Sequence, residues 1–409
     1  MTYESAKKLL EDWGQSHLLK YYNELDETEK QSLLDQIEGT DFSLLDNLKE
    51  ENRFSAQRGK IEPLGAVTVD DIARNSESYR STGVDAIRSG KVAAVLLAGG
   101  QGTRLGFDKP KGMFNIGVNR ELFIFQCLIN NLMKVVEETG SYIPLCIMTS
   151  EKNNEDTVNF FREKDFFGYN SDYVSFFIQD MAPSVDFNGK ILMESKSRIS
   201  SSPNGNGGWF SSLVRSGLMD KLKAQGVEWL NVFAVDNVLQ QIADPMFIGA
   251  VIESGCESGS KCVAKADPYE RVGAMCLEDG MPSIVEYYEL TDEMANQRLD
   301  NGELAYKFGV ILNYLFRLDR LVEINSSRMP VHIVEKKIPH IDENGCQVSP
   351  EKPNGFKFET LILDMIHMNR SCLPYEIVRN REFAPVKNPT GVDSVVSARA
   401  LLTENGVEL

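Results

Sequence analysis

Two basic side chains, Arg104 and Lys111, follow an apolar run that ends in glycines. The run covers Val92–Ala98, the turn reads Gly99-Gly100-Gln101-Gly102, and a further glycine follows at Gly106. A glycine turn at the carboxyl end of a buried strand lets backbone N–H groups approach a phosphate closely. Arg104 and Lys111 would add positive charge at the same place, so this segment predicts a phosphate-binding site.

The spacing of these glycines differs from that of two commoner motifs. A phosphate-binding P-loop has four residues between its glycines, followed by Lys and Ser or Thr. Here three residues separate Gly102 from Gly106, and Phe107-Asp108 follow. In the dinucleotide motif Gly-x-Gly-x-x-Gly the third glycine would come one position earlier than Gly106. We therefore favour another kind of phosphate site, with an NAD-dependent oxidoreductase and a purely structural turn as the alternatives.

A carboxylate and a second glycine loop occur further along the chain. Asp236 follows the apolar run Trp229–Val235, and three glycines occur in Pro203–Gly208. A carboxylate at the tip of a buried strand in a phosphate site commonly holds Mg²⁺, which takes one or two carboxylates together with phosphate oxygens. The alternative role of Asp236 is to cap the following helix. The glycine loop suggests close backbone approach to a ligand, or else a flexible connection.

Three other polar side chains could contact a nucleotide. Gln179 follows an apolar run that ends at Ile178, and its amide could hydrogen-bond a base edge. Lys357 and Lys387 are lysines among apolar residues, and either could instead be a surface lysine whose stem lies on apolar neighbours. The four histidines form no metal-binding spacing, and Gly-x-Ser-x-Gly is absent, so hydrolase chemistry is disfavoured.

These groups fit transfer of a nucleotidyl group to a sugar phosphate. The nucleophile would already be anionic near neutral pH, because the second pKa of a phosphate is about 6. No side chain need remove a proton. Catalysis would rest on alignment and on spreading negative charge over Arg, Lys and Mg²⁺.

Composition limits the class of protein. The 409 residues are 42% hydrophobic, and 43 Lys and Arg against 60 Asp and Glu give a formal net charge of −17. Sequence-independent binding to nucleic acid needs basic surface and is excluded. The seven cysteines include no Cys-x-x-Cys, which is typical of buried thiols in a reducing compartment. The N-terminus does not resemble a signal peptide, and no run of 18 apolar residues occurs, so we expect a soluble cytoplasmic protein.

The elements that must position these groups alternate between strand and helix from Lys91 onward. This alternation predicts an α/β fold with a mainly parallel sheet, helices on both faces, and functional residues at the carboxyl ends of the strands. The expected strands are 92–97, 145–149, 174–178 and 229–235, and the expected helices are 122–138, 156–163, 213–225, 359–368 and 394–402. Short antiparallel strands are expected at 263–265, 274–277 and 284–288. Residues 1–50 are expected to be helical, with Asp26-x-x-Glu29 as a capping box and Asp41 as a second cap, followed by a linker and a further helix within 51–90.

The chain resembles the UDP-sugar pyrophosphorylase family, most closely its eukaryotic UDP-N-acetylglucosamine pyrophosphorylase branch. The resemblance runs from about residue 90 to 400. It rests on Leu97–Gly106 with Pro110-Lys111-Gly112, Met148-Thr149-Ser150, Gln179–Pro183, Pro203–Gly208, Val235-Asp236-Asn237, Val285-Glu286-Tyr287, Lys336–Pro339, Lys352–Gly355 and Phe383–Asn388.

The resemblance implies a uridylyltransferase with a Rossmann-like, GT-A-like catalytic domain over 89–390, an N-terminal helical region over 1–88 and a helical tail over 391–409. UTP and a sugar 1-phosphate would be the substrates and Mg²⁺ the cofactor, with no nucleic acid or membrane partner. Arg104, Lys111 and Lys387 would be catalytic, and Asp236 would hold the metal. UTP would be bound by Leu97, Ala98, Gly99, Gly100, Lys111, Gln179, Gly205, Asp236 and Lys357, and the sugar by Asn206, Gly273, Glu286, Tyr287 and Lys387.

Two departures from the family pattern affect these expectations. Val310 stands in Gly309-Val310-Ile311-Leu312-Asn313 where the family has an Asn that touches the sugar. Glucose and galactose 1-phosphates therefore remain alternatives to N-acetylglucosamine 1-phosphate, and a catalytically silent UDP-sugar sensor is a non-enzymatic one. The family also has a further C-terminal domain that this sequence, which ends at Leu409, is expected to lack.

Overall fold

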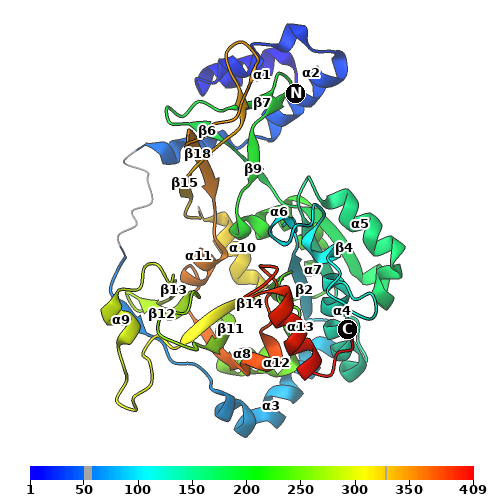
Figure 1. Ribbon diagram of the computed structural model, residues 1–409, viewed down its shortest axis with the longest axis vertical. Helices are drawn as coiled ribbons and strands as arrows, with labels where there is room; N and C mark the ends of the chain where they lie inside the picture. The colour runs from blue at the N-terminus through cyan, green and yellow to red at the C-terminus, as the bar shows by residue number, and fades with distance from the viewer. Residues whose placement is uncertain (50–57, 328) are drawn as a thin grey trace. The chain divides into compact units, whose positions relative to one another are not determined.

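The computed structural model describes residues 1–49, 58–327 and 329–409 (Figure 1). The chain forms two compact units, each assembled from three stretches of sequence. Unit 1 comprises Met1–Gln57, Asp180–Gly208 and Met329–Ile362, and unit 2 comprises Arg58–Gln179, Trp209–Arg328 and Leu363–Leu409. The first residues of the expected linker, 51–57, lie outside the described residues.

Unit 2 is built on a ten-stranded sheet with the order β1-β12-β14-β10-β2-β3-β4, to which β11, β13 and β19 add. Strands β10, β2, β3 and β4 run parallel, whereas β14 pairs antiparallel with β10. This confirms the predicted α/β class. The bounds are β1 Ile61–Pro63, β2 Val92–Leu97, β3 Leu145–Thr149, β4 Val174–Ile178, β10 Trp229–Ala234, β11 Ser258–Ala264, β12 Ala274–Glu278, β13 Met281–Val285, β14 Phe308–Arg317 and β19 Cys372–Ile377.

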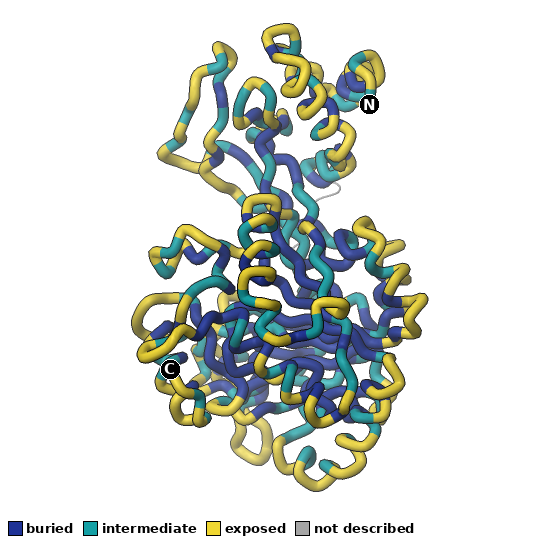
Figure 2. The backbone as a smooth tube through the Cα atoms, turned by 90° about the vertical axis from the view of Figure 1, so that its right-hand side faces the viewer, coloured by how far each residue is buried: buried dark blue, intermediate teal, exposed yellow. Residues whose placement is uncertain are grey.

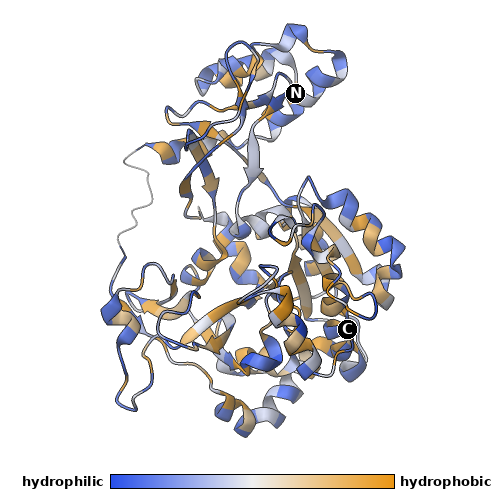
Figure 3. Cartoon of the chain, in the orientation of Figure 1, coloured by the Kyte–Doolittle hydropathy of each residue, from blue (hydrophilic) through white to orange (hydrophobic). Residues whose placement is uncertain are grey.

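Helices pack around this sheet, and its buried strands form the apolar centre of the unit (Figures 2 and 3). Strand β2 is buried along its whole length because both of its faces are covered. The helices are α3 Val69–Arg88, α4 Ile124–Thr139, α5 Asn154–Glu163, α6 Trp209–Arg215, α7 Leu218–Ala224, α8 Pro245–Ser254, α9 Asp292–Asn296, α10 Leu318–Ser326, α11 Ile362–His367, α12 Arg379–Glu382 and α13 Val395–Glu404. None of the described helices is long and apolar enough to cross a membrane.

Four sequence predictions need correction here. The strand expected at 284–288 is β13, which runs over Met281–Val285 and ends there because a turn follows at 287–289. The helix expected over 213–225 is two helices, α6 and α7, because Gly217 takes a left-handed conformation (φ 78°) between them. The helix expected over 359–368 begins only at Ile362, because Glu359 ends strand β18 (Gly355–Glu359). The short strand expected at 263–265 is the end of the longer β11, whose buried polar residues conceal it in the sequence.

Unit 1 combines the N-terminal helices with small antiparallel sheets. Its helices α1 (Tyr3–Asp12) and α2 (Glu27–Gly39) share one apolar core with residues of the two later segments. The capping box of Asp26 and Glu29 and the cap made by Asp41 are confirmed. The strands are β5 Met181–Pro183, β6 Val185–Asp186, β7 Met193–Ser195, β8 Arg198–Ile199, β9 Ser201–Pro203, β15 His332–Lys336, β16 His340–Ile341, β17 Gln347–Val348 and β18.

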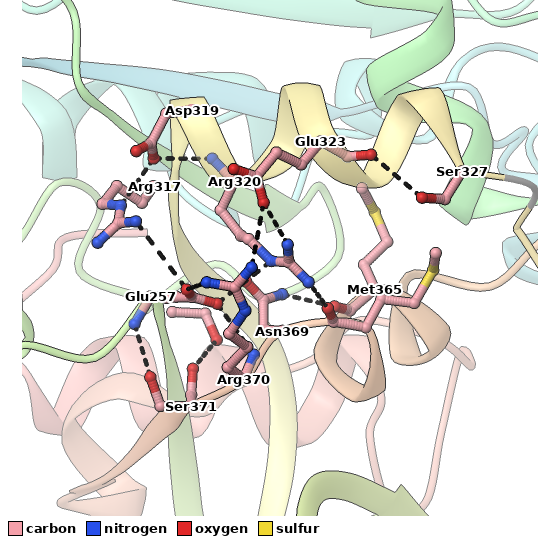
Figure 4. A network of polar contacts seen from close by, with 12 residues as sticks. Glu257, Arg317, Asp319, Arg320, Glu323, Ser327, Met365, Asn369, Arg370 and Ser371 are labelled. Atoms are coloured by element: carbon pink, nitrogen blue, oxygen red, sulfur yellow. Dashed lines mark hydrogen bonds and ion pairs between the residues drawn. The ribbon is translucent and has the colours of Figure 1, made fainter.

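A charged network anchors one edge of the unit 2 sheet (Figure 4). Glu257 precedes β11, and its carboxylate lies 3.2 Å from Arg320 Nε and accepts a hydrogen bond from the backbone N–H of Arg370 at 2.9 Å. Arg317, the last residue of β14, pairs with Trp229, the first residue of β10. The network therefore lies at the end of β10 opposite to the one that leads into Asp236, and it is a structural anchor.

Candidate active site

The glycine segment after β2 folds back on itself and fixes both of its basic residues. The N–H of Gly102 donates to the carbonyl of Lys109 at 2.9 Å, and the N–H of Lys111 donates to the carbonyl of Gly100 at 3.1 Å. Arg104 lies on an exposed 3-10 turn within the loop, and Lys111 begins a second such turn and is partly buried. The backbone positions of both residues are thus fixed next to the carboxyl end of β2.

Three of the predicted phosphate and metal residues, Arg104, Asp236 and Lys387, act electrostatically on the fourth, Lys111. Burial lowers the pKa of Lys111, the nearby cations Arg104 and Lys387 lower it further, and Asp236 opposes them. Lys387 also lies 3.1 Å from the carboxylate of Asp393. Unit 2 therefore brings Arg104, Lys111, Asp236 and Lys387 into one region, in which Asp393 is a second acid beside Lys387.

Asn237, which the sequence prediction passed over, joins the two segments that carry Asp236 and Lys387. Its side-chain amide donates to the carbonyl of Glu382 at 2.7 Å and accepts from the N–H of Ala384 at 2.9 Å. The N–H of Val386 donates to the carbonyl of Asp236 at 2.8 Å. The signal available in the sequence was an amide next to Asp236, three residues after the end of a buried strand.

Gln179, the residue predicted to bind the base, lies beside the carboxyl end of β2. Gln179 follows β4, is 6% exposed, and its N–H donates to the carbonyl of Thr149 at 2.8 Å. A Cβ atom at Gly99 would lie 3.0 Å from Oε1 of Gln179, so glycine permits this close approach. Asn153, also unpredicted, donates from its buried side chain to the carbonyl of Ala98 at 3.0 Å and thereby holds the end of β2. Leu97 and Ala98 are buried there, while Gly100 is exposed.

Three of the predicted sugar residues lie together at the β12–β13 hairpin. A Cβ atom at Gly273 would lie 3.4 Å from the carboxylate of Glu286, and the N–H of Val310 donates to the carbonyl of Gly273 at 2.8 Å. Burial raises the pKa of Glu286, and the neighbouring Glu289 adds to the increase. Tyr287 is 43% exposed beside Glu286. The region therefore offers a half-buried acid, an exposed aromatic ring and a buried glycine that lets the Glu286 side chain approach closely.

The remaining predicted residues belong to unit 1. Gly205 has φ 85°, and a Cβ atom there would lie 2.2 Å from the carbonyl oxygen of Thr360, so only glycine fits. Asn206 accepts a hydrogen bond from the N–H of Ile362 at 3.0 Å. Lys357 lies on β18, the strand that leads into this segment. Unit 1 thus holds its glycine loop against the residues that follow β18.

The donor set of unit 2 suits a metal that is held mainly by its substrate. Among the described residues, no three His, Cys, Asp or Glu side chains gather as a metal site. Asp236 offers a partly buried carboxylate close to Lys111. One carboxylate with substrate phosphates is an ordinary environment for Mg²⁺, so Asp236 fits this cation and no all-protein cage is needed.

Comparisons with known proteins identify the family of the chain. Residues 44–407 match the family described as UTP–glucose-1-phosphate uridylyltransferase. UDP-N-acetylglucosamine pyrophosphorylase of Saccharomyces cerevisiae is 34% identical over 412 residues, which cover 94% of this chain and 86% of the yeast protein. UDP-N-acetylhexosamine pyrophosphorylase-like protein 1 of Homo sapiens is 34% identical, covering 98% of this chain and 84% of the human protein.

A solved structure of the uridine diphosphate N-acetylglucosamine pyrophosphorylase from Trypanosoma brucei superimposes with a TM-score of 0.84 at 29% identity, covering 98% of this chain and 84% of that one. The resemblance that the motifs indicated is thereby confirmed over almost the whole sequence. The chain belongs to the UTP–glucose-1-phosphate uridylyltransferase family and is a nucleotidyltransferase that forms a UDP-sugar.

Proposed function

We propose that this protein converts UTP and N-acetylglucosamine 1-phosphate to UDP-N-acetylglucosamine and pyrophosphate in the cytoplasm, using Mg²⁺. A phosphate oxygen of the sugar phosphate attacks the α-phosphorus of UTP, and the bond from that phosphorus to the bridging oxygen of pyrophosphate breaks. The observation that carries the proposal is the grouping of Arg104, Lys111, Lys387 and Asp236 at the strand ends. The names of the yeast and T. brucei relatives favour this sugar.

The geometry supports a division of work between these groups. Arg104 and Lys111 take the phosphates of UTP, and Lys387 takes the phosphate of the sugar, so negative charge that develops at the α-phosphate faces fixed cations. Asp236 is the residue that would hold Mg²⁺, which would neutralise phosphate charge when bound. Because the nucleophile is already anionic, the site requires no general base.

Substrate contacts follow from the same assignment. Leu97–Gly100 and Gln179 contact uridine, and Glu286 with Tyr287 and Gly273 contacts the sugar. In unit 1, we assign Gly205 to uracil, Asn206 to the sugar and Lys357 to the nucleotide phosphates.

Val310 bears on the choice of sugar. Its backbone contacts Gly273, and its side chain has no polar atom with which to bind a hydroxyl or an N-acetyl group. A site that lacks such a partner discriminates less strongly between related sugars. We therefore expect measurable activity with glucose 1-phosphate or galactose 1-phosphate beside that with N-acetylglucosamine 1-phosphate.

Pyrophosphate release tests the proposal directly. The purified protein is supplied with UTP and, in turn, each of the three sugar 1-phosphates, with and without EDTA, followed by addition of Mg²⁺. Release that requires both substrates and returns with Mg²⁺ supports the proposal. Binding of UDP-sugar without release under any condition would instead identify a sensor, and tight NAD binding without UTP binding an oxidoreductase.

A further inference from the structure

Arg58 reaches the turn that carries Glu286 and Tyr287 from a distant part of the sequence. Its guanidinium makes a two-pronged contact with Glu289, from Nη2 to Oε2 at 2.8 Å and from Nε to Oε1 at 3.2 Å. Such forked pairs between arginine and carboxylate are strong and directional. The Arg58 side chain is 30% exposed and that of Glu289 is 31% exposed, so water screens the pair only in part.

The same guanidinium also binds the strand that enters the turn. Nη2 donates to the carbonyl of Ile284 at 2.6 Å, and Nη1 donates to Glu278 at 2.6 Å. Glu289 in turn accepts the N–H of Glu286 at 2.8 Å. Arg58 therefore connects the end of β13 with the far side of the turn, and one bonded carboxylate separates it from the backbone of Glu286.

Arg58 itself is held in place by its neighbours in the chain. The N–H of Gly59 donates to Glu278 at 2.9 Å, and the N–H of Lys60 donates to Asp279 at 2.9 Å. Strand β1 then pairs with β12 in antiparallel register. The guanidinium is thus presented by a fixed backbone and not by a freely moving surface segment.

Charge gives Arg58 a second effect on Glu286. Glu278, Glu286 and Glu289 are three acids around one arginine. Burial opposes ionisation of all three, but hydrogen bonds from Gly59, Ser283 and Arg58 lower the pKa of Glu278, and hydrogen bonds from Arg58 and the N–H of Glu286 lower that of Glu289. The charge of Arg58 also offsets part of the rise in the pKa of Glu286. Without Arg58, Glu289 would repel Glu286 with no compensating cation. The turn would then either open, or one of the two acids would bind a proton.

We propose that Arg58 is a positioning residue for the sugar 1-phosphate, which acts by fixing the turn that presents Glu286 and Tyr287. This inference rests on the proposed function, because it takes those two residues as sugar contacts. An interaction made equally in the ground state and the transition state changes KM and leaves kcat unaltered. Loss of Arg58 should therefore weaken the use of one substrate only.

Steady-state kinetics with each substrate varied separately tests this. Arg58→Ala is expected to raise KM for the sugar 1-phosphate about tenfold, with kcat and KM for UTP within about twofold of the unaltered protein. Arg58→Lys, which keeps the charge but loses the fork, should give a smaller increase. Lys60→Ala is the matched control, because the Lys60 side chain is 74% exposed and forms a surface pair with Glu62 at 2.9 Å.

Adding Glu289→Gln to Arg58→Ala gives a rescue test, because it removes the uncompensated charge and keeps an acceptor for the N–H of Glu286. A partial recovery of KM supports the proposal. An unchanged KM for the sugar 1-phosphate in both Arg58→Ala and Arg58→Lys overturns it. A lower kcat with similar increases in both KM values and a lower melting temperature also overturns it, because that result would show a general structural role. If the unaltered protein itself releases no pyrophosphate, the proposed function fails and not this inference alone.

Discussion

Replacing Lys261 by methionine should sharply reduce the free energy of unfolding. The Lys261 side chain is fully buried in β11, and its Nζ lies 2.8 Å from Asp244 and 2.6 Å from Glu382, whose side chains are 8% and 11% exposed. Burial alone would lower the pKa of Lys261, but the two carboxylates outweigh burial and raise it. Methionine has nearly the same length without the charge, so the substitution leaves two carboxylates in the interior with no cation.

The magnitude follows from the cost of breaking a buried ion pair, which is about 3–5 kcal/mol. One of the two acids can reduce this cost by binding a proton, and burial already raises the pKa of Glu382. When the pKa of an acid is higher in the folded state than in the unfolded state, the free energy of unfolding falls as the pH rises from the lower pKa to the higher one. The destabilisation by Lys261→Met should therefore be larger at pH 8 than at pH 5.

Urea unfolding, followed by circular dichroism at both pH values, measures this difference. Lys91→Met serves as the control, because Lys91 and Glu228 form a surface pair at 3.0 Å with side chains 44% and 53% exposed, and its loss should cost less than about 1 kcal/mol. Adding Asp244→Asn and Glu382→Gln to Lys261→Met should restore much of the stability. A cost below about 1 kcal/mol, or one that does not depend on pH, would refute the reasoning.

Further predictions concern the site and the thiols. Lys387→Ala should lower kcat by about 10²–10³ with a much smaller change in UTP binding, measured by titration, because the lysine acts on the sugar phosphate and the developing charge; an unchanged kcat would remove this role. Gly99→Val should raise KM for UTP, since its side chain would collide with Gln179, and wild-type kinetics would contradict the placement of the base. Cys346 is exposed and should react first with a thiol reagent, whereas the buried thiols should react only on unfolding. Burial raises the pKa of four thiols to about 12, namely Cys127, Cys146, Cys262 and Cys276. The folded state therefore keeps protons that the unfolded state loses above about pH 9, and urea unfolding should show a free energy of unfolding that falls between about pH 9 and 12.

The strands of the parallel half of the sheet could be predicted almost to the residue. Strands β2 and β3 are buried at every position, because both faces of the sheet are covered there, and their residues are therefore mostly apolar. Strand β4 is only partly buried, but four of its five residues are apolar. Their carboxyl ends meet at one edge, so the grouping of Gly99 and Gln179 followed from topology alone.

Features that depend on distant contacts could not be predicted. Strand β11 contains Lys261, and a lysine is expected to be exposed unless its charge is paired. Its burial is explained by Asp244 and Glu382, which lie elsewhere in the sequence. The role of Arg58 depends on Glu289, which lies far away in the sequence. Nothing in the local sequence distinguishes Asn153 and Asn237 from other asparagines. Their roles depend on the carbonyl groups that they bind, those of Ala98 and Glu382, which lie in distant segments.

The three-segment construction of unit 1 has a consequence for biosynthesis. Helices α1 and α2 leave the ribosome before the other two segments of unit 1, yet the apolar core that they share is completed by residues that include Ile199 and Phe358. Domains generally fold as units during synthesis, at roughly 5–20 residues per second. The nascent N-terminal helices must therefore wait tens of seconds with an uncovered apolar face, while unit 2 is translated between their partners. During that interval the emerging chain is a natural client for a chaperone.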